Sequence, residues 1–393
     1  RYSRMVPLSE IAANDYNLNI PRYIDSSEPE DLHDLSAHLR GGIPNRDIDA
    51  LQEYWQVFPS VRATLFAPAR NGYSRALVNA AEVKKTILEH EEFKTFAVQS
   101  LVPFTDWAER SNLKAIEQGE LPKAIIHRIS EDLLQSYAQT SLLSKYDIYQ
   151  ILMDYWAESM QDDVYVLVQD SWPAGKVLRE LVTNKGEKLK EVPDLVIGKA
   201  KYKAELIPPA LIVARFFAAE QAKVDNLQSA LDSVSQELET YLEENSGEEG
   251  LLADALNEKD KVTKASVTTR LKLATDKDEK AALNQAKKLF DAEADAKKAL
   301  KDAQGALDLL VFQQYPQLTE SEIKSLIVQD KWLATLQTKI NAEIERITQK
   351  LANRVKELEE RYAEPLPAIT QSVEDLSEKV AAHLKAMGLE WAV

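Results

Sequence analysis

The side chains that most often carry out chemistry are scarce in this sequence. It has 393 residues, five histidines and no cysteine, so disulfides, thiol nucleophiles and cysteine-based zinc sites are excluded. His33 and His38 are five residues apart, which on one helix places them on different faces, and no histidine pair has the i, i+4 spacing of a helical metal site. No Gly-x-Ser-x-Gly segment marks a serine nucleophile. We therefore predict no metal site and no catalytic residue in this chain.

Sites that bind a phosphate or a cofactor need clustered glycines, and these are also missing. Gly41-Gly42 is the only glycine pair, and its place before Ile43-Pro44 fits the end of a helix. Acidic runs such as Glu243-Glu244 are typical of solvated helix ends. The residues alone therefore predict no cofactor-binding position.

Basic residues are concentrated in one part of an otherwise acidic chain. The net charge of −16 argues against a protein that coats nucleic acid nonspecifically. Residues 251–300 nevertheless hold 11 Lys+Arg against 9 Asp+Glu. Candidate contacts to the DNA backbone in an irregular stretch there are Lys259, Lys261, Lys264, Arg270 and Lys272. The alternative is a plain surface loop.

Long helices are the elements that must position these residues. Glycine and proline are few, with 11 and 15 residues, so extended helical runs are allowed. One stripe of apolar residues has alternating spacings of three and four, which is the a/d pattern of a helical seam: Val224, Leu227, Leu231, Val234, Leu238 and Tyr241. We predict that this stripe is a partner interface. The alternative is the core of an intramolecular helical bundle.

The C-terminal third also has the pattern of long amphipathic helices. Thr319 and Glu322 predict a capping box, and Leu318 with Ile323 predicts a hydrophobic staple. Apolar residues then recur about every 3.6 positions from Leu333 to Tyr362, which predicts one packed helix. A last helix carries apolar residues at helical spacing over residues 369–387.

The fold class follows from these segments. Val164–Val168 is β-branched and aromatic and is the best strand candidate, with a second short strand or a loop expected over residues 171–204. We expect a mainly α protein: a helical domain with a small mixed α/β element, followed by long antiparallel helices of coiled-coil character. The expected division is an extended segment over 1–25, a mostly helical domain over 26–205 and a long-helix domain over 206–393.

The first residues also carry a family resemblance. The segment from Leu8 to Ile24, LSEIAANDYNLNIPRYI, resembles a signature of the modification subunits of type I restriction-modification systems. The segments His38–Pro44, Asp47–Leu51 and Tyr54-Trp55 continue the likeness in the same order. Near the other end, Tyr315–Thr319 and Asp330–Ala334 are also similar to the family.

The resemblance implies part of an adenine-N6 DNA methyltransferase, which flips its target base and transfers a methyl group from S-adenosylmethionine. Catalysis in that family uses an Asn/Asp-Pro-Pro-aromatic motif, and this motif is missing. The one Pro-Pro pair, Pro208-Pro209, follows Ile207 and precedes Ala210, so we read it as a helix start. Because the chain begins with Arg1, we expect a C-terminal fragment without the catalytic domain. No catalytic or cofactor position is carried over from the family, and S-adenosylmethionine belongs to the full-length protein.

The resemblance further implies the partners. These are a specificity subunit, on whose helical connectors the C-terminal helices pack, the motor-nuclease subunit of the restriction complex, and double-stranded DNA reached through the complex. No signal peptide and no bilayer-long apolar run is evident, so we expect a soluble cytoplasmic protein with no membrane partner. The alternatives are a non-enzymatic coiled-coil adaptor or scaffold, and a self-sufficient enzyme of unknown type.

Overall fold

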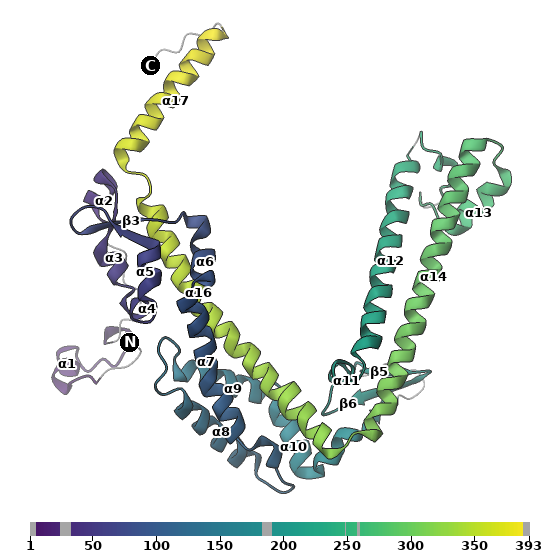
Figure 1. Ribbon diagram of the computed structural model, residues 1–393, viewed down its shortest axis with the longest axis horizontal. Helices are drawn as coiled ribbons and strands as arrows, with labels where there is room; N and C mark the ends of the chain where they lie inside the picture. The colour runs from purple at the N-terminus through teal and green to yellow at the C-terminus, as the bar shows by residue number, and fades with distance from the viewer. Residues whose placement is uncertain (1–4, 24–32, 183–190, 248, 258–259, 388–393) are drawn as a thin grey trace. The chain divides into compact units, whose positions relative to one another are not determined.

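The computed structural model describes residues 5–23, 33–182, 191–247, 249–257 and 260–387. The chain is mainly helical, with 73% helix and 6% strand, and it has two small antiparallel sheets and several long helices, which confirms the predicted fold class. It divides into two compact units: one joins Arg1–Phe96 to Ile347–Val393, and the other is Ala97–Arg346 (Figure 1). The domain boundaries expected from the sequence, at residues 25 and 205, follow changes of composition, and they stay a prediction.

The first unit is made of short helices, one small sheet and the C-terminal helices. Its sheet has the strand order β1-β3-β2, with Ile43 opposite Ser74 and Phe66 opposite Ala76. Its elements are α1 (Leu8–Ala13), η1 (Ile20–Arg22), α2 (Leu35–Arg40), β1 (Ile43–Pro44), α3 (Asn45–Asp49), α4 (Gln52–Val57), α5 (Pro59–Leu65), β2 (Phe66–Pro68), β3 (Tyr73–Ala76), α6 (Ala80–Glu89), the start of α7 (Glu91–Arg110), the end of α16 (Ala334–Tyr362) and α17 (Leu366–Ala386).

Aromatic residues form the core of this unit. The ring of Phe58 contacts those of Phe93 and Phe96, with centroids 6.0 and 5.2 Å apart. The ring of Tyr362, the last residue of α16, lies tilted against that of His38 of α2 with centroids 5.1 Å apart, and its hydroxyl donates a hydrogen bond to Asp47. The C-terminal end of α16 is thereby fixed to α2 and α3.

The N-terminal segment is folded back on itself, and the expectation of an extended segment was wrong for its described part. Residues 8–13 form α1, Asp15 and Tyr16 have positive φ angles, and Ile20 begins the 3₁₀ turn η1. The side chain of Asn17 accepts a hydrogen bond from the backbone N–H of Asn19, which is an Asx turn. This local bonding outweighs the extended bias that Pro21 gives to the residue before it.

The second unit has more and longer helices. Its sheet has the order β4-β6-β5, with Leu178 opposite Ala204 and Leu195 opposite Tyr202. Its elements are the rest of α7, η2 (Leu113–Ala115), α8 (Pro122–Ser136), α9 (Lys145–Tyr155), the π-helix η3 (Trp156–Met160), α10 (Gln161–Asp170), η4 (Trp172–Lys176), β4 (Leu178–Glu180), β5 (Leu195–Ile197), β6 (Ala200–Ala204), α11 (Pro209–Phe216), α12 (Ala218–Asn245), η5 (Ala253–Ala255), α13 (Lys264–Leu273), α14 (Lys277–Gln314), η6 (Tyr315–Gln317), α15 (Glu320–Lys324), the π-helix η7 (Ser325–Leu333) and the start of α16.

The strand predicted at Val164–Val168 is wrong, because these residues lie within α10. Met160, Val164 and Leu167 are buried, which is the spacing of one helical face. Tyr165 is exposed, so the apolar residues do not alternate as in a strand. Burial along a helical face therefore outweighs the β-propensity of this run, and the strands of this unit lie farther along the chain, over residues 178–204.

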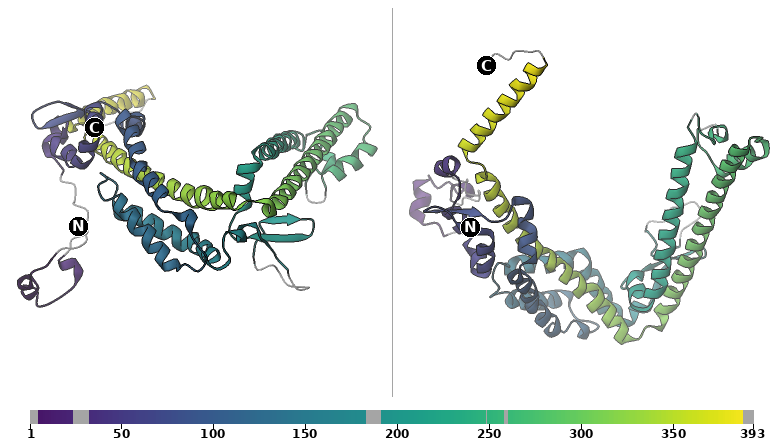
Figure 2. Two further views of the ribbon diagram at one scale, coloured as in Figure 1. Left: turned by 60° about the horizontal axis from the view of Figure 1, so that its bottom comes forward. Right: turned by 45° about the horizontal axis from the view of Figure 1, so that its top comes forward.

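Two long helices form a hairpin within this unit. Helices α12 and α14 lie side by side in all three views (Figures 1 and 2), and the 38 residues of α14 extend roughly 57 Å. Residues 246–276, which we call the tip, connect them and include η5 and α13. At the opposite end, the hydroxyl of Tyr315 donates to the backbone oxygen of Ile207 at 2.5 Å, which holds the two ends of the hairpin segment together.

The predicted start of the C-terminal helices is confirmed. Thr319 and Glu322 form the capping box, and Leu318 and Ile323 are both fully buried. The helix continues through η7 into α16, in which buried residues recur from Leu336 to Tyr362 at helical spacing.

Candidate functional site

The stripe predicted as a partner interface lies on α12 and takes part in the hairpin. Val224 and Leu238 are 7% and 5% exposed, whereas Leu227, Leu231, Val234 and Tyr241 are half-buried. The Tyr241 hydroxyl donates to Ala282 of α14 at 3.2 Å, and Ser235 donates to Glu293 of α14 at 3.0 Å. The bundle-core alternative therefore accounts for much of the stripe, while four of its six side chains keep part of their surface.

The tip has a small hydrophobic core of its own. Leu252 and Val267 are fully buried there with Leu283 of α14, and the half-buried Tyr241 and Phe290 pack against them. Thr263 and Ser266 form a capping box that begins α13. The basic stretch is therefore a folded substructure, not the irregular loop that the sequence suggested.

The structure separates the predicted DNA contacts into two groups. Lys264 pairs with Asp291 at 2.5 Å, and Arg270 pairs with Asp254 at 2.7 Å and with Glu279 at 2.5 Å. These ion pairs join the tip to α14 and give both cations a structural function. Lys261 and Lys272 are exposed. Lys259 lies outside the described residues.

The most exposed apolar surface on a described helix belongs to α17. We call its apolar residues the α17 stripe: Leu366, Ile369, Val373, Leu376, Val380, Leu384 and Met387. All except the half-buried Leu384 are exposed, from 42% at Ile369 to 74% at Met387. The sequence predicted the helix correctly, but periodicity alone does not show whether an apolar face is covered.

A buried ion pair at the base of the hairpin was missed by the sequence analysis. Lys331 contacts the two carboxylate oxygens of Asp163 at 2.8 and 2.7 Å and also donates to the backbone oxygen of Leu206 at 2.8 Å. The indole N–H of Trp332 donates to the same carboxylate at 2.7 Å. Asp163 is 4% exposed. These contacts join α10, the segment after β6 and η7.

The electrostatics of this cluster are set by burial. Burial raises the pKa of Asp163, while the charge and hydrogen bond of Lys331 and the hydrogen bond of Trp332 lower it. Burial also raises the pKa of Tyr155 to about 12, and its hydroxyl lies 3.5 Å from the backbone oxygen of Lys331. Tyr155 and Asp163, which lie on either side of the π-helical segment η3, thus both contact η7. The carboxylate of Asp163, the ammonium group of Lys331 and the indole N–H of Trp332 all bond within the protein, which indicates a structural function for this cluster.

Two of the segments that resemble the restriction-modification family occupy this base. Asp330, Lys331 and Trp332 are consecutive on η7, and Asp330 accepts two hydrogen bonds from Arg215 of α11 at 2.8 and 2.9 Å. Tyr315 bonds to Ile207, as described above. Tyr315 and Asp330 therefore hold the base of the hairpin within the second unit.

The candidate metal ligands are arranged differently from the prediction. His33 lies before the start of α2, and its ring stacks on that of His38. Nδ1 of His33 is 3.2 Å from Nε2 of His38. The expectation that they lie on different faces of one helix is wrong, because only His38 is helical. Among the described residues, no group of three or more His, Cys, Asp or Glu side chains is placed to hold a metal ion.

The described helices include none that is both long and apolar enough to cross a membrane. Comparison of this chain with protein-family models, with curated proteins and with solved structures finds no match.

Proposed function

We propose that this chain is the C-terminal region of the modification subunit of a type I restriction-modification DNA adenine-N6 methyltransferase. In this proposal it assembles with the specificity subunit and helps the complex to embrace double-stranded DNA in the cytoplasm. S-adenosylmethionine is bound by a catalytic domain elsewhere in the parent protein. The motor-nuclease subunit joins the complex for cleavage.

The observation that carries the proposal is the exposed α17 stripe. Five large apolar side chains along α17 and that of its C-cap residue Met387 are exposed, and burying them on a partner stabilises the complex by about 25 cal/mol per Å² of apolar surface removed from water. An amphipathic helix of this kind is a common mode of docking to other helices. The family resemblance supplies the class of partner, which is the pair of helical connectors of a specificity subunit.

The hairpin offers a second contact. A shallow groove of about 430 Å³ runs along α12 and is lined by Ser233, Gln236, Glu237, Thr240, Tyr241 and Glu244. Tyr241 belongs to the predicted interface stripe and lies at its distal end. We propose that α12 contributes through this groove and through the partly exposed residues of the stripe.

The tip supplies the proposed contact with DNA. Lys261 and Lys272 of the tip are exposed, and both are available to phosphate groups in the assembled complex. Lys264 and Arg270 support the tip through their ion pairs. The proposed DNA contact therefore rests on two side chains instead of five.

The test is co-purification of the chain with a specificity subunit from a co-expression strain. Leu376→Asp places a charge in the α17 stripe and should abolish co-purification without changing the melting temperature of the chain, because Leu376 is already exposed. Ala382→Asp adds the same charge on another face of α17 and is the matched control. Unchanged co-purification of Leu376→Asp, or equal loss in both variants, would contradict the proposal.

A non-enzymatic helical adaptor is the second candidate, because an exposed amphipathic helix serves either function. The two are distinguished by reading the coding sequence upstream of Arg1. An open frame that encodes an Asn-Pro-Pro-aromatic motif favours the methyltransferase subunit. An initiator codon immediately before Arg1 favours the adaptor.

A further inference from the structure

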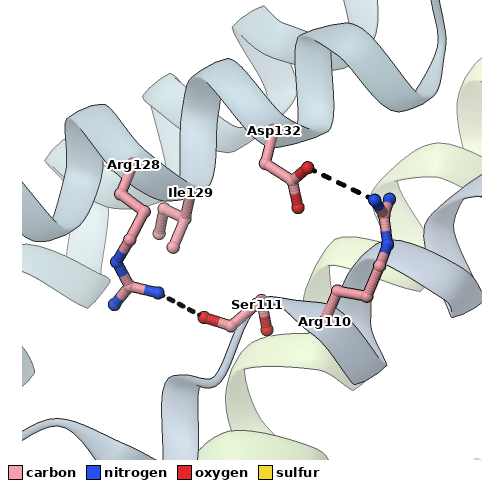
Figure 3. A pocket seen from close by; sticks show the side chains of 5 residues that line it. All are labelled: Arg110, Ser111, Arg128, Ile129 and Asp132. Carbon is pink, nitrogen blue, oxygen red and sulfur yellow. Dashed lines mark hydrogen bonds and ion pairs between the residues drawn. The ribbon is translucent and has the colours of Figure 1, made fainter.

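A cavity of about 360 Å³ lies where the end of α7 meets α8, within the unit Ala97–Arg346 (Figure 3). It is lined by Arg110 and Ser111 at the end of α7 and by Arg128, Ile129 and Asp132 of α8. Two guanidinium groups and one carboxylate give this wall a formal charge of +1. The whole chain has a charge of −16, so the charge of this wall is opposite in sign to the net charge of the chain.

Two oppositely charged neighbours in the wall of the cavity contact different partners. Arg128 and Asp132 are four residues apart on α8, a spacing at which opposite charges ordinarily pair. Among the ion pairs of the described residues, none joins these two. Arg128 instead donates to the backbone oxygen of Ser111 at 2.6 Å, and Asp132 forms an ion pair with the exposed Arg110 at 3.6 Å. Figure 3 shows Arg128 directed towards Ser111 and Asp132 directed towards Arg110, with Ile129 between them on α8.

Arg110 is oriented by contacts on its own side. Its Nε donates to the backbone oxygen of Asp106 at 3.2 Å, and its Nη2 donates to the hydroxyl of Ser136 at 2.9 Å. At 3.6 Å its Nη1 is too far from Asp132 for a hydrogen bond. Donors of Arg110 and Arg128 thus line the cavity together with two acceptors, the Asp132 carboxylate and the backbone oxygen of Ser111.

We infer that this cavity binds a small dicarboxylate that also carries an ammonium group, such as an acidic amino acid. Each guanidinium takes one carboxylate with the N–H groups that its internal contacts leave free, since a guanidinium carries five donors. The ammonium group donates to Asp132 and to the backbone oxygen of Ser111. The ligand's net charge of about −1 then balances the +1 of the wall, and the volume is within the range of pockets for small molecules, which starts near about 300 Å³. This inference is independent of partner docking by α17.

The ligand test uses isothermal titration calorimetry of the full 393-residue chain at matched ionic strength. L-Glutamate should bind saturably. Glutarate, which lacks the ammonium group, and 4-aminobutyrate, which lacks one carboxylate, should each bind about tenfold more weakly, because each leaves a charged group of the cavity without its partner. Absence of saturable glutamate binding, or equal affinity for glutamate and glutarate, would overturn the inference.

Single substitutions test which side chain of the cavity binds which charged group of glutamate. Asp132→Asn should remove the preference for glutamate over glutarate, whereas the neighbouring Glu131→Gln, which makes the same chemical change outside the cavity, should retain it. Arg128→Gln should weaken glutamate binding about tenfold, and Lys123→Gln on the same helix should not. Because Arg128 also bonds to Ser111, Arg128→Lys is included, and the melting temperature of each variant is measured. Equal responses within a matched pair of folded variants would refute the site.

Discussion

At the scale of single residues, the most consequential contact is the buried pair of Asp163 and Lys331. Both charges are removed from water. Asp163 also accepts a hydrogen bond from Trp332, and Lys331 also donates one to the backbone oxygen of Leu206. Removing charges from water is costly, so such a pair adds little net stability, but removing one member leaves the other buried and uncompensated. The pair therefore makes the base of the hairpin sensitive to substitution.

We expect Asp163→Asn to lower the free energy of unfolding by about 3–5 kcal/mol, because the ammonium group of Lys331 would lose its counter-charge inside the protein. Equilibrium unfolding in urea measures this change. The neighbouring Asp162→Asn is the control, because Asp162 is exposed and its loss should alter stability by less than about 0.5 kcal/mol. Similar losses in both variants would show that the cluster is not the source of the effect.

At the scale of elements, the hairpin of α12 and α14 has a stripe that is only partly covered. Leu238 is buried, and Leu231, one heptad earlier, is half-buried. A seam that served the hairpin alone would bury both equally, since they occupy equivalent positions of the repeat. The difference separates a part of α12 that stabilises the fold from a part that keeps exposed surface, which the proposed function assigns to a partner.

We expect Leu238→Ala to lower the free energy of unfolding by about 2–5 kcal/mol, since it leaves a cavity in the seam. Leu231→Ala should cost less stability and should weaken co-purification with a specificity subunit more. Thermal unfolding and co-purification are measured on both variants side by side. A heavy loss of stability in both, with normal binding by the refolded proteins, would assign the whole stripe to the core.

How much of these elements the sequence predicts depends on whether the signal is local. The capping box at Thr319 and the helix that ends at Tyr362 are predicted correctly, because caps and helical periodicity are local. The strand at Val164–Val168 is not, because its conformation is decided by which side chains the rest of the unit buries. Pairing of Asp163 with Lys331, 168 residues away, and the exposure of the α17 stripe are properties of tertiary structure that no local pattern contains.

At the scale of the whole molecule, the proposed function assigns assembly to this chain and chemistry to another domain. Pro208-Pro209, the one Pro-Pro pair, begins α11, as the sequence predicted, with Pro208 at the N-cap. It has neither the amide before it nor the aromatic ring after it that would hold a flipped adenine. The described residues also bring together no group of metal-ligating side chains.

We therefore expect this chain by itself neither to bind S-adenosylmethionine nor to methylate DNA. Calorimetric titration with S-adenosylmethionine should give no saturable heat, and a methyl-transfer assay with duplex DNA should give no product. Both measurements use a complete modification subunit of a type I restriction-modification system as the positive control. Saturable, stoichiometric binding to these 393 residues would disprove this assignment.

The hydrogen bond between Tyr315 and Ile207 has a consequence for how this protein can change over evolution. It joins residues 108 positions apart, so the chain leaves the base of the second unit and returns to nearly the same point. A segment with adjoining ends can be shortened, lengthened or exchanged without moving the residues on either side. Adding one heptad to each of α12 and α14 would extend the hairpin by roughly 10 Å and keep its seam in phase. Homologues can therefore vary in the length of the α12–α14 hairpin while retaining the same contacts at its base.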